Sequence, residues 1–223
     1  MGKNMGKRIL WMIIGNVLLG VGCGFFRLAE LGMDAYSSLV LGLSDLTGIQ
    51  FGTTMLILNS MLLVVMLFMD IRHIGAGTIV NLVIIGYISD AVYWLVRDYI
   101  GYRPEGFTQS LFLVVALLLV GLGIALYTTP ELGNSPYDDM GFIIEGRSRG
   151  RIKLHFARII SDMVSLVGGI AFALVSGQSV FRVAGVGTIC SAVLTGFLIG
   201  IFKKYLAIPL IWGRKEHGEK ATD

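Results

Sequence analysis

Residues 75–86 have the sequence GAGTIVNLVIIG, and residues 185–196 have the sequence GVGTICSAVLTG. Aligned without a gap, the two stretches share three glycines and the pair Thr78 and Thr188. Glycine and apolar residues are common in membrane-spanning helices, so one match of this kind could arise by chance. A duplication of the chain needs a second match in the same order.

The second match lies upstream of the first in each half of the chain. Residues 20–32 match residues 121–133 at a constant offset, with Gly-x-Gly at the start and Glu-Leu-Gly at the end. Tyr36 then falls on Tyr137. Two matches in the same order predict that the chain is an internal repeat.

The composition predicts that lipid is the solvent of this chain. Of its 223 residues, 55% are hydrophobic and 15% are charged, whereas soluble domains carry about 25% charged residues. The formal net charge is +3, and the basic residues flank apolar segments. Nucleic-acid binding requires a basic face with stacking aromatic residues, so we expect no nucleic-acid partner.

Six apolar runs reach the length of about 20 residues that a membrane-spanning helix needs. We therefore expect an all-α membrane protein, with a single transmembrane domain over residues 1–223. Repeat one covers about 9–96 and repeat two about 108–208, with three spans each. Because three is odd, the second repeat must enter the bilayer from the opposite side, which predicts inverted repeats as in many secondary transporters. The predicted spans are 9–28, 51–69, 74–96, 110–127, 156–175 and 183–202.

The basic residues near the span ends predict the orientation. Lysine and arginine concentrate in cytoplasmic loops. With six spans, most of the basic residues fall on one side, whereas the loop 30–50 on the other side has no lysine or arginine. We expect both termini in the cytoplasm. The residues on the basic side are Lys3, Lys7, Arg8, Arg72, Arg147, Arg149, Arg151, Lys153, Lys203, Lys204, Arg214, Lys215 and Lys220.

A short segment follows the first span of each repeat, at 34–45 and at 135–145. Both begin with helix-capping residues after a Leu-Gly break and are too short to span. We expect two short helices that either re-enter the membrane or lie at its interface. If they re-enter, their N-termini bring free N–H groups and a positive dipole end toward the midplane from opposite sides.

Three motifs resemble those of the YczE/YyaS/YitT-like group of bacterial membrane proteins. They are Leu-Gly-x-x-Pro-Tyr-Asp at 132–138, Thr-Gly-x-x-Phe-Gly-Thr at 47–53 and Gly-x-Gly-Thr at 75–78. The resemblance covers roughly residues 15–202. The first repeat departs from the pattern, because residues 34–37 read Asp-Ala-Tyr-Ser where the family suggests Ser-Pro-Trp-Asp. The resemblance implies a bacterial inner-membrane protein and names no substrate.

Polar residues inside spans and on the two short segments are the candidates for a site. Such residues are costly in lipid and are functional candidates by default. Each also has a plainer explanation: the carboxylates cap helices or pair with Arg27 or Arg158, and the amides form interhelical hydrogen bonds. Asp90 in the third span is a weaker candidate of the same kind. The candidate substrate-binding residues are Asp34, Asn59, Asn81, Tyr137, Asp138 and Asp162.

These observations favour a small-solute transporter over an enzyme. The sequence shows no catalytic constellation, metal-ligand spacing or cofactor motif, so we expect no enzymatic activity, no metal and no cofactor. We expect membrane lipid as a partner, a zwitterionic or cationic small solute as substrate, and a homodimer, because 223 residues are few for a solitary carrier. The alternative is a scaffold or sensor that modulates a partner protein, which predicts a tightly packed bundle without a water-accessible cavity.

Overall fold

The computed structural model describes residues 5–69, 74–148 and 151–213, and this part of the chain is helical without strands. Six of its helical segments are long and apolar enough to cross a membrane, so the chain is a multi-pass membrane protein. The helices of the first half are α1 (Met5–Ala29), α2 (Ala35–Thr47), α3 (Phe51–Met69) and α4 (Ala76–Tyr93), which a π-helical turn continues over Trp94–Tyr99. Those of the second half are α5 (Phe107–Thr128), α6 (Pro136–Arg147), α7 (Leu154–Val175), α8 (Val180–Val183) and α9 (Val186–Phe202), followed by a π-helical turn (Lys203–Ala207) and α10 (Ile208–Ile211).

The observed spans follow the apolar runs of the sequence. The predicted span 51–69 coincides with α3, the predicted span 74–96 is observed from Ala76 to Tyr99, and the other long helices extend their predicted spans at one or both ends. The largest difference is at the sixth span, where α8 precedes α9 and the helical chain continues to Ile211. Several residues of the predicted basic side lie outside the described residues, namely Lys3, Arg72, Arg149, Arg214, Lys215 and Lys220.

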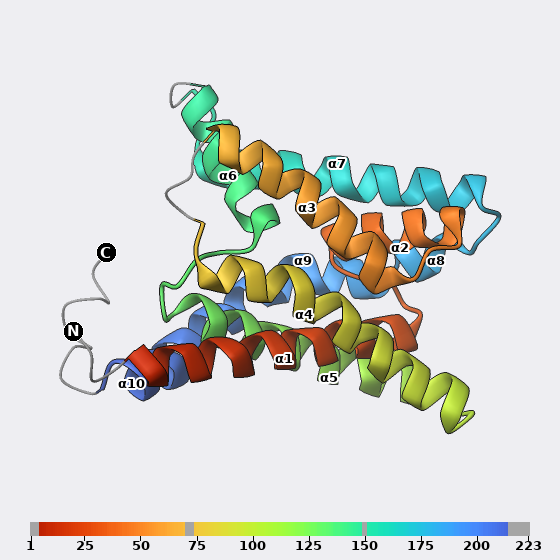
Figure 1. Cartoon of the computed structure of the whole chain (residues 1–223). Helices are drawn as coiled ribbons and strands as arrows, with labels where there is room; N and C mark the ends of the chain where they lie inside the picture. Colours follow the sequence, from red (N-terminus) through yellow and green to blue (C-terminus); the bar gives the residue numbers. More distant parts are fainter. Residues whose placement is uncertain (1–4, 70–73, 149–150, 214–223) are drawn as a thin grey trace.

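The helices form two layers (Figure 1). One layer contains α1, α4, α5 and α9, and the other contains α2, α3, α6 and α7. At the centre of the first layer, α1 and α5 lie side by side and run in opposite directions. Glycines allow this close approach, because a Cβ atom on Gly123 would lie 2.7 Å from the Leu19 nitrogen.

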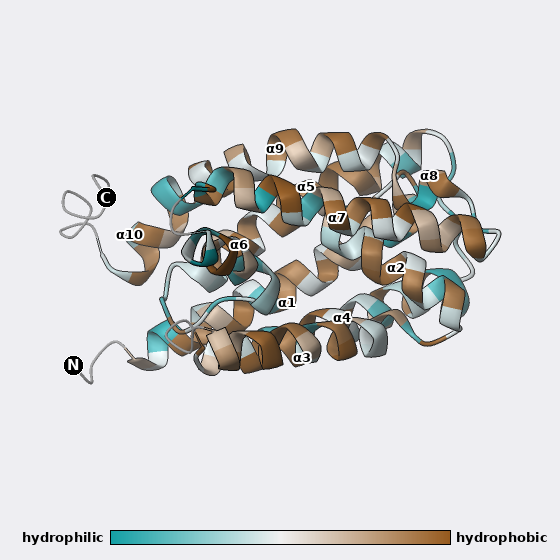
Figure 2. Cartoon of the chain, turned by 90° about the horizontal axis from the view of Figure 1, so that it is seen from above, coloured by the Kyte–Doolittle hydropathy of each residue, from teal (hydrophilic) through white to brown (hydrophobic). Residues whose placement is uncertain are grey.

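The two short helices lie in a row between α3 and α7 (Figure 2). Each begins after a sharp turn in which a glutamate takes positive φ, 54° at Glu30 and 55° at Glu131, followed by Gly32 and Gly133, also at positive φ. Helix α2 is then capped by Asp34, whose side chain accepts a hydrogen bond from the Ser37 N–H. The turns lead the chain from one layer into the other and back toward mid-span, so that a short helix can start beside the middle of the long ones.

The motifs that match in sequence meet across the two halves. The N–H of Gly187 donates to the Leu31 carbonyl at 2.7 Å, and the N–H of Gly77 donates to the Leu132 carbonyl at 2.8 Å. A Cβ atom on Gly133 would lie 2.7 Å from the Gly75 nitrogen. The Leu-Gly turn of each half therefore packs on the Gly-x-Gly-Thr helix start of the other half, and no larger residue fits at the contact.

Candidate functional site

A cavity of about 140 Å³ lies where the N-termini of α2 and α6 meet. Its walls also include residues from the middle of α1, α3, α4, α5 and α9, such as Leu19 of α1 and Val120 of α5. The cavity is therefore at mid-span depth. The polar or aromatic residues of its lining are Asp34, Tyr36, Ser37, Asn59, Asn81, Tyr127, Ser135, Tyr137, Asp138 and Thr195.

The structure brings the candidate residues of the sequence together. Five of the six line this cavity, although they lie on four different helices or helix starts. The sixth, Asp162 on α7, is one hydrogen bond away, because its Oδ1 atom accepts from the Tyr137 hydroxyl at 2.7 Å. The five lining residues are Asp34, Asn59, Asn81, Tyr137 and Asp138.

Two tyrosines at matching positions of the repeat stack at the boundary of the cavity. The ring centroids of Tyr36 and Tyr137 are 4.3 Å apart, with an interplanar angle of 22°. The Tyr36 hydroxyl donates to Oδ1 of Asn59 on α3 at 2.6 Å, much as the Tyr137 hydroxyl donates to Asp162 on α7. Each ring is therefore tied to the third helix of its own half, through an amide in one half and a carboxylate in the other.

Asp138 is an ion-paired carboxylate in the first turn of α6. Its Oδ1 atom accepts a hydrogen bond from Arg158 at 2.8 Å, and its Oδ2 atom accepts one from the buried Tyr127 hydroxyl. The N-cap residue of α6 is Ser135, which makes no side-chain cap hydrogen bond. Asp138 thus faces the cavity with a buried hydroxyl on one side and a half-exposed guanidinium on the other.

Asp34 differs from Asp138 in having no ion pair to any described residue. Its Oδ1 atom accepts the capping hydrogen bond from the Ser37 N–H at 3.1 Å. Burial raises the pKa of this carboxyl group, the hydrogen bonds from Ser37 offset part of that rise, and the negative charge of Asp162 adds a smaller rise. A cation beside Asp34 would stabilise the carboxylate, so this end of the cavity favours an ammonium group or a proton.

The two amides are the most buried polar residues of the site. Asn81 is 1% exposed and donates from Nδ2 to Oδ1 of Asn16, which is 0% exposed, at 2.9 Å. Asn59 is 2% exposed. Both are held by protein partners, as interhelical hydrogen bonding would predict, and both also line the cavity.

Asp90 has a structural role and lies outside the cavity lining. It pairs with Arg27 at 2.7 Å, and its Oδ2 atom accepts from the Gly52 N–H, also at 2.7 Å. The Arg27 guanidinium also lies over the rings of Phe51 and Tyr93. The plainer explanation of Asp90, an ion pair with Arg27, is therefore the one the structure supports.

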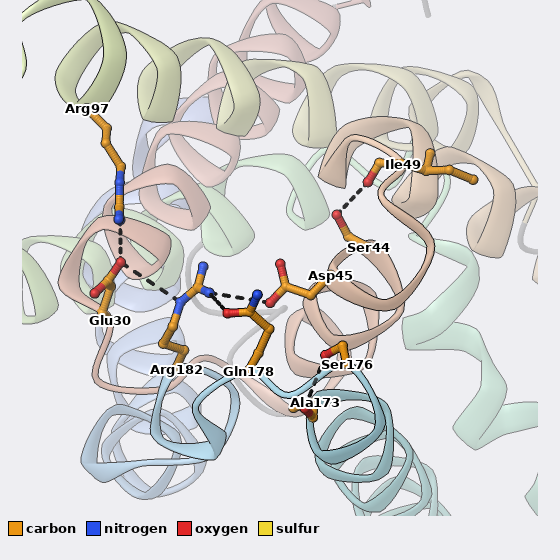
Figure 3. Close-up of polar contacts among 9 residues, drawn as sticks. All are labelled: Glu30, Ser44, Asp45, Ile49, Arg97, Ala173, Ser176, Gln178 and Arg182. Carbon is orange, nitrogen blue, oxygen red and sulfur yellow. Dashed lines mark hydrogen bonds and ion pairs between the residues drawn. The ribbon is translucent and has the colours of Figure 1, made fainter.

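A charged cluster joins the two halves at the end of the bundle where α1 ends (Figure 3). Arg182 of α8 lies between Glu30, at 3.9 Å, and Asp45 of α2, at 3.5 Å. Arg97 pairs with the same Glu30 carboxylate, and Gln178 accepts a hydrogen bond from Arg182 at 2.9 Å. These contacts connect α8 of the second half to α1, α2 and the π-helical turn of the first.

Sequence reasoning overlooked several residues of the cavity lining, Tyr36 and Tyr127 among them, and it overlooked Asn16, which accepts the Asn81 hydrogen bond from outside the lining. The repeat itself carried the signal for Tyr36, because this residue aligns with Tyr137. Asn16 is a polar residue inside a span, which is the same signal that identified Asn59 and Asn81. Tyr127 ends an apolar run and carries no such signal; only the fold brings its hydroxyl to Asp138.

Residues 6–204 match the family of unknown function DUF6198, and the chain belongs to this family. It is 26% identical over 203 residues to an uncharacterized protein of Haemophilus influenzae, covering 90% of this chain and 85% of that protein. It is also 25% identical over 189 residues to the uncharacterized protein YyaS of Bacillus subtilis, covering 85% of this chain and 89% of YyaS. The resemblance to YyaS-like proteins is thus confirmed. No solved structure matches the chain.

Proposed function

We propose that this protein is a small-solute transporter of the bacterial inner membrane, with its substrate site in the central cavity. The observation that carries the proposal is the meeting of α2 and α6. Two short helices start at mid-span, and residues of both first turns line one cavity together with polar side chains of the long helices. Irregular backbone at this depth is tolerated in membrane proteins where it lines water or ligand.

We further propose that the family relationship of this chain extends to the YczE and YitT proteins. We also propose that its two halves are inverted repeats. Support comes from the reciprocal contact of the Leu-Gly turns with the Gly-x-Gly-Thr helix starts. The equivalent helices α1 and α5 run in opposite directions, as an axis in the membrane plane requires (Figure 1). The central cavity then lies beside this axis, where carriers with inverted repeats bind their substrates.

The cavity chemistry supports a small cationic or zwitterionic substrate. Among the described residues, the lining contains the carboxylates of Asp34 and Asp138 and no basic side chain. A volume of about 140 Å³ is below the roughly 300–1,000 Å³ of sites for drug-sized ligands. Because Asp34 has a raised pKa and no ion pair among the described residues, a proton and the substrate cation would compete for it.

In an alternating-access mechanism, the charged cluster of Glu30, Asp45, Arg97 and Arg182 would act as a gate. Arg182 ties the second half to Glu30 and Asp45 of the first half at one end of the bundle, and Arg97 pairs with the same Glu30. We propose that these contacts hold that end closed in this conformation. We propose that this end faces the periplasm and that both termini are cytoplasmic. Rocking of one repeat against the other would break the contacts of Arg182 and open that end.

We also propose a homodimer that forms through α9. Gly196 and Gly200 are exposed, with nothing within 4 Å of a Cβ atom on either. Small residues four positions apart let two membrane helices approach closely. Another glycine pair with this spacing, Gly20 and Gly24, packs within the chain against α4, near Ile88 and Val92.

The decisive experiment is uptake into proteoliposomes. We would test labelled tetramethylammonium as a permanent cation, glycine as a zwitterion and lactate as an anion, with an imposed pH gradient. We expect protein-dependent uptake of one of the first two probes and none of lactate. Uptake of none of them would contradict the cationic or zwitterionic assignment.

Cys23 provides a test against the alternative, a scaffold or sensor without transport. This buried thiol lines the cavity. In a Cys190→Ser background, we expect a small cationic methanethiosulfonate reagent to label Cys23, and tetramethylammonium to slow the labelling. A Cys23 thiol that resists the reagent in the folded protein would favour the scaffold.

A further inference from the structure

An apolar cleft of about 400 Å³ lies beside the cavity, with walls from α2, α3, α6 and α7. Leu58 and Met61 of α3, Met140 of α6 and Val164 of α7 are among its lining residues. The two serines of the lining donate their hydroxyls within the protein, to the Ala157 carbonyl and to Tyr137. The walls of the cleft are therefore almost entirely apolar, and an apolar space of this kind does not hold water.

The cleft is open to the depth at which acyl chains lie. Its residues on α3 and α7 are near the middle of both spans. Met61 and Val164, at the rim, are 61% and 68% exposed. In a bilayer these side chains contact lipid, so the acyl chains of the lipids surround the opening of the cleft.

The cleft and the central cavity share one wall. Tyr36 and Tyr137 line both spaces, and their stacked rings are the boundary between them. Because each hydroxyl is bonded to α3 or α7, a shift of either long helix would move a ring and join the two spaces.

The polar side of this wall suits an ammonium group. Asp34 supplies a carboxylate without an ion pair to any described residue, whereas the carboxylate of Asp138 is paired with Arg158. The rings of Tyr36, Tyr127 and Tyr137 line the same space. Carboxylates combined with aromatic rings are the usual recognition chemistry for quaternary ammonium ions. The small volume of the cavity restricts the head group to one of few atoms.

We propose that the substrate is a single-chain amphiphile with a small ammonium head, which binds in the cavity while its alkyl chain occupies the cleft. This inference rests on the proposed function and specifies its substrate class. Each methylene of the alkyl chain that leaves water raises the apparent affinity of the amphiphile, measured from aqueous solution, about fourfold. The alkyl chain gains little free energy when it moves from lipid into the cleft, because both surroundings are hydrocarbon. We therefore expect the amphiphile to enter the cleft laterally from the bilayer.

The test compares two probes with the same head: tetramethylammonium and dodecyltrimethylammonium. Binding is measured from the rise in unfolding temperature of the full chain in phosphatidylcholine nanodiscs, over a range of probe concentrations. Met140→Trp fills the cleft without touching the cavity lining. Overpacking of this kind should weaken binding of the dodecyl probe by about tenfold or more, and leave binding of tetramethylammonium unchanged.

Two variants on one helix provide a matched pair if Met140→Trp fails to fold. Val164→Trp adds bulk at the rim of the cleft, and Val167→Trp adds the same bulk one turn away, at a residue that is 60% exposed and outside the cleft lining. We expect only Val164→Trp to weaken binding of the dodecyl probe.

Each contrary outcome has a distinct meaning. If the wild type binds tetramethylammonium but not the dodecyl probe, the amphiphile inference is overturned and the proposed small-solute site stands. If it binds neither, the amphiphile inference is overturned, and the glycine uptake assay then decides whether the proposed small-solute site stands. If the cleft variants change the oligomeric state and leave the dodecyl probe bound as before, a second copy of the chain occupies the cleft and the inference is overturned.

Discussion

Replacing Asp34 by Asn separates the capping role of this residue from its charge. In the structure the Asp34 carboxylate caps α2 through the Ser37 N–H at 3.1 Å and also lines the cavity. Asparagine caps helices about as well as aspartate, so α2 should form normally in the variant. The substitution therefore removes one negative charge from the cavity and leaves the local backbone in place.

The expected loss of cation binding follows from the burial of this carboxylate. Tetramethylammonium has no N–H to donate, so its attraction to Asp34 is Coulombic. Two unit charges about 5 Å apart at an effective dielectric constant of about 20 interact by about 3 kcal/mol, so Asp34→Asn should raise the Kd of tetramethylammonium by up to roughly 100-fold. The stability of the Asp34→Asn protein, in contrast, should not fall. Because the pKa of Asp34 is raised in the folded protein, ionisation opposes folding, and wild-type stability falls as pH rises through that pKa. The variant should lack this fall and be at least as stable at alkaline pH.

Binding and thermal unfolding, measured on the same samples from mild acid to alkaline pH, test both statements. Asp34→Ala is the matched control, because it removes the cap together with the charge and should cost about 1 kcal/mol of stability. An Asp34→Asn protein that binds tetramethylammonium like the wild type would refute the reasoning and leave Asp34 a helix cap.

Three further predictions concern residues around the site. Asp90→Asn should leave the Arg27 charge unpaired and lower the free energy of unfolding, measured by chemical unfolding, by about 3–5 kcal/mol. The cation affinity of the folded protein should not change, and a selective loss of binding would contradict the structural role. Gly196→Leu should shift cross-linking and native mass spectra from dimer to monomer, whereas an unchanged dimer would exclude this face of α9. Arg182→Gln should increase labelling of Cys23 by an impermeant thiol reagent added from the periplasmic side, and unchanged labelling would argue against a gate.

The fold was largely predictable because its strongest signals are local. The uncharged apolar run 51–69 became α3 with the same bounds, since nothing inside it favours another structure. The Leu-Gly turns were marked by glycines that adopt positive φ. The sixth span was less accurate, because α8 and the break before α9 depend on packing of Gly185 against the Leu31 carbonyl, a contact with the other half of the chain.

The site was predictable where the repeat marked it and not where partners are distant in sequence. Asp34 and Asp138 follow matching turns, so their positions suggested a shared location. For Asp90 the sequence offered both a functional role and an ion pair with Arg27, and it could not decide between them, because Arg27 and Gly52 belong to other helices. The stack of Tyr36 on Tyr137 requires both short helices to start at one point, which no local pattern specifies.

The acceptors of the two stacked tyrosines differ, Asn59 in one half and Asp162 in the other, and this difference leads to a last prediction. Both side chains accept a hydrogen bond from a stacked tyrosine, so Asp162→Asn should keep the Tyr137 contact and make the two tyrosine contacts alike. It also removes a negative charge that disfavours ionisation of Asp34. The pKa of Asp34 should fall, and the midpoint of pH-dependent tetramethylammonium binding should move to lower pH. Asn59→Asp should move the midpoint to higher pH; shifts in the same direction for both variants, or none, would show that Asp34 does not control binding.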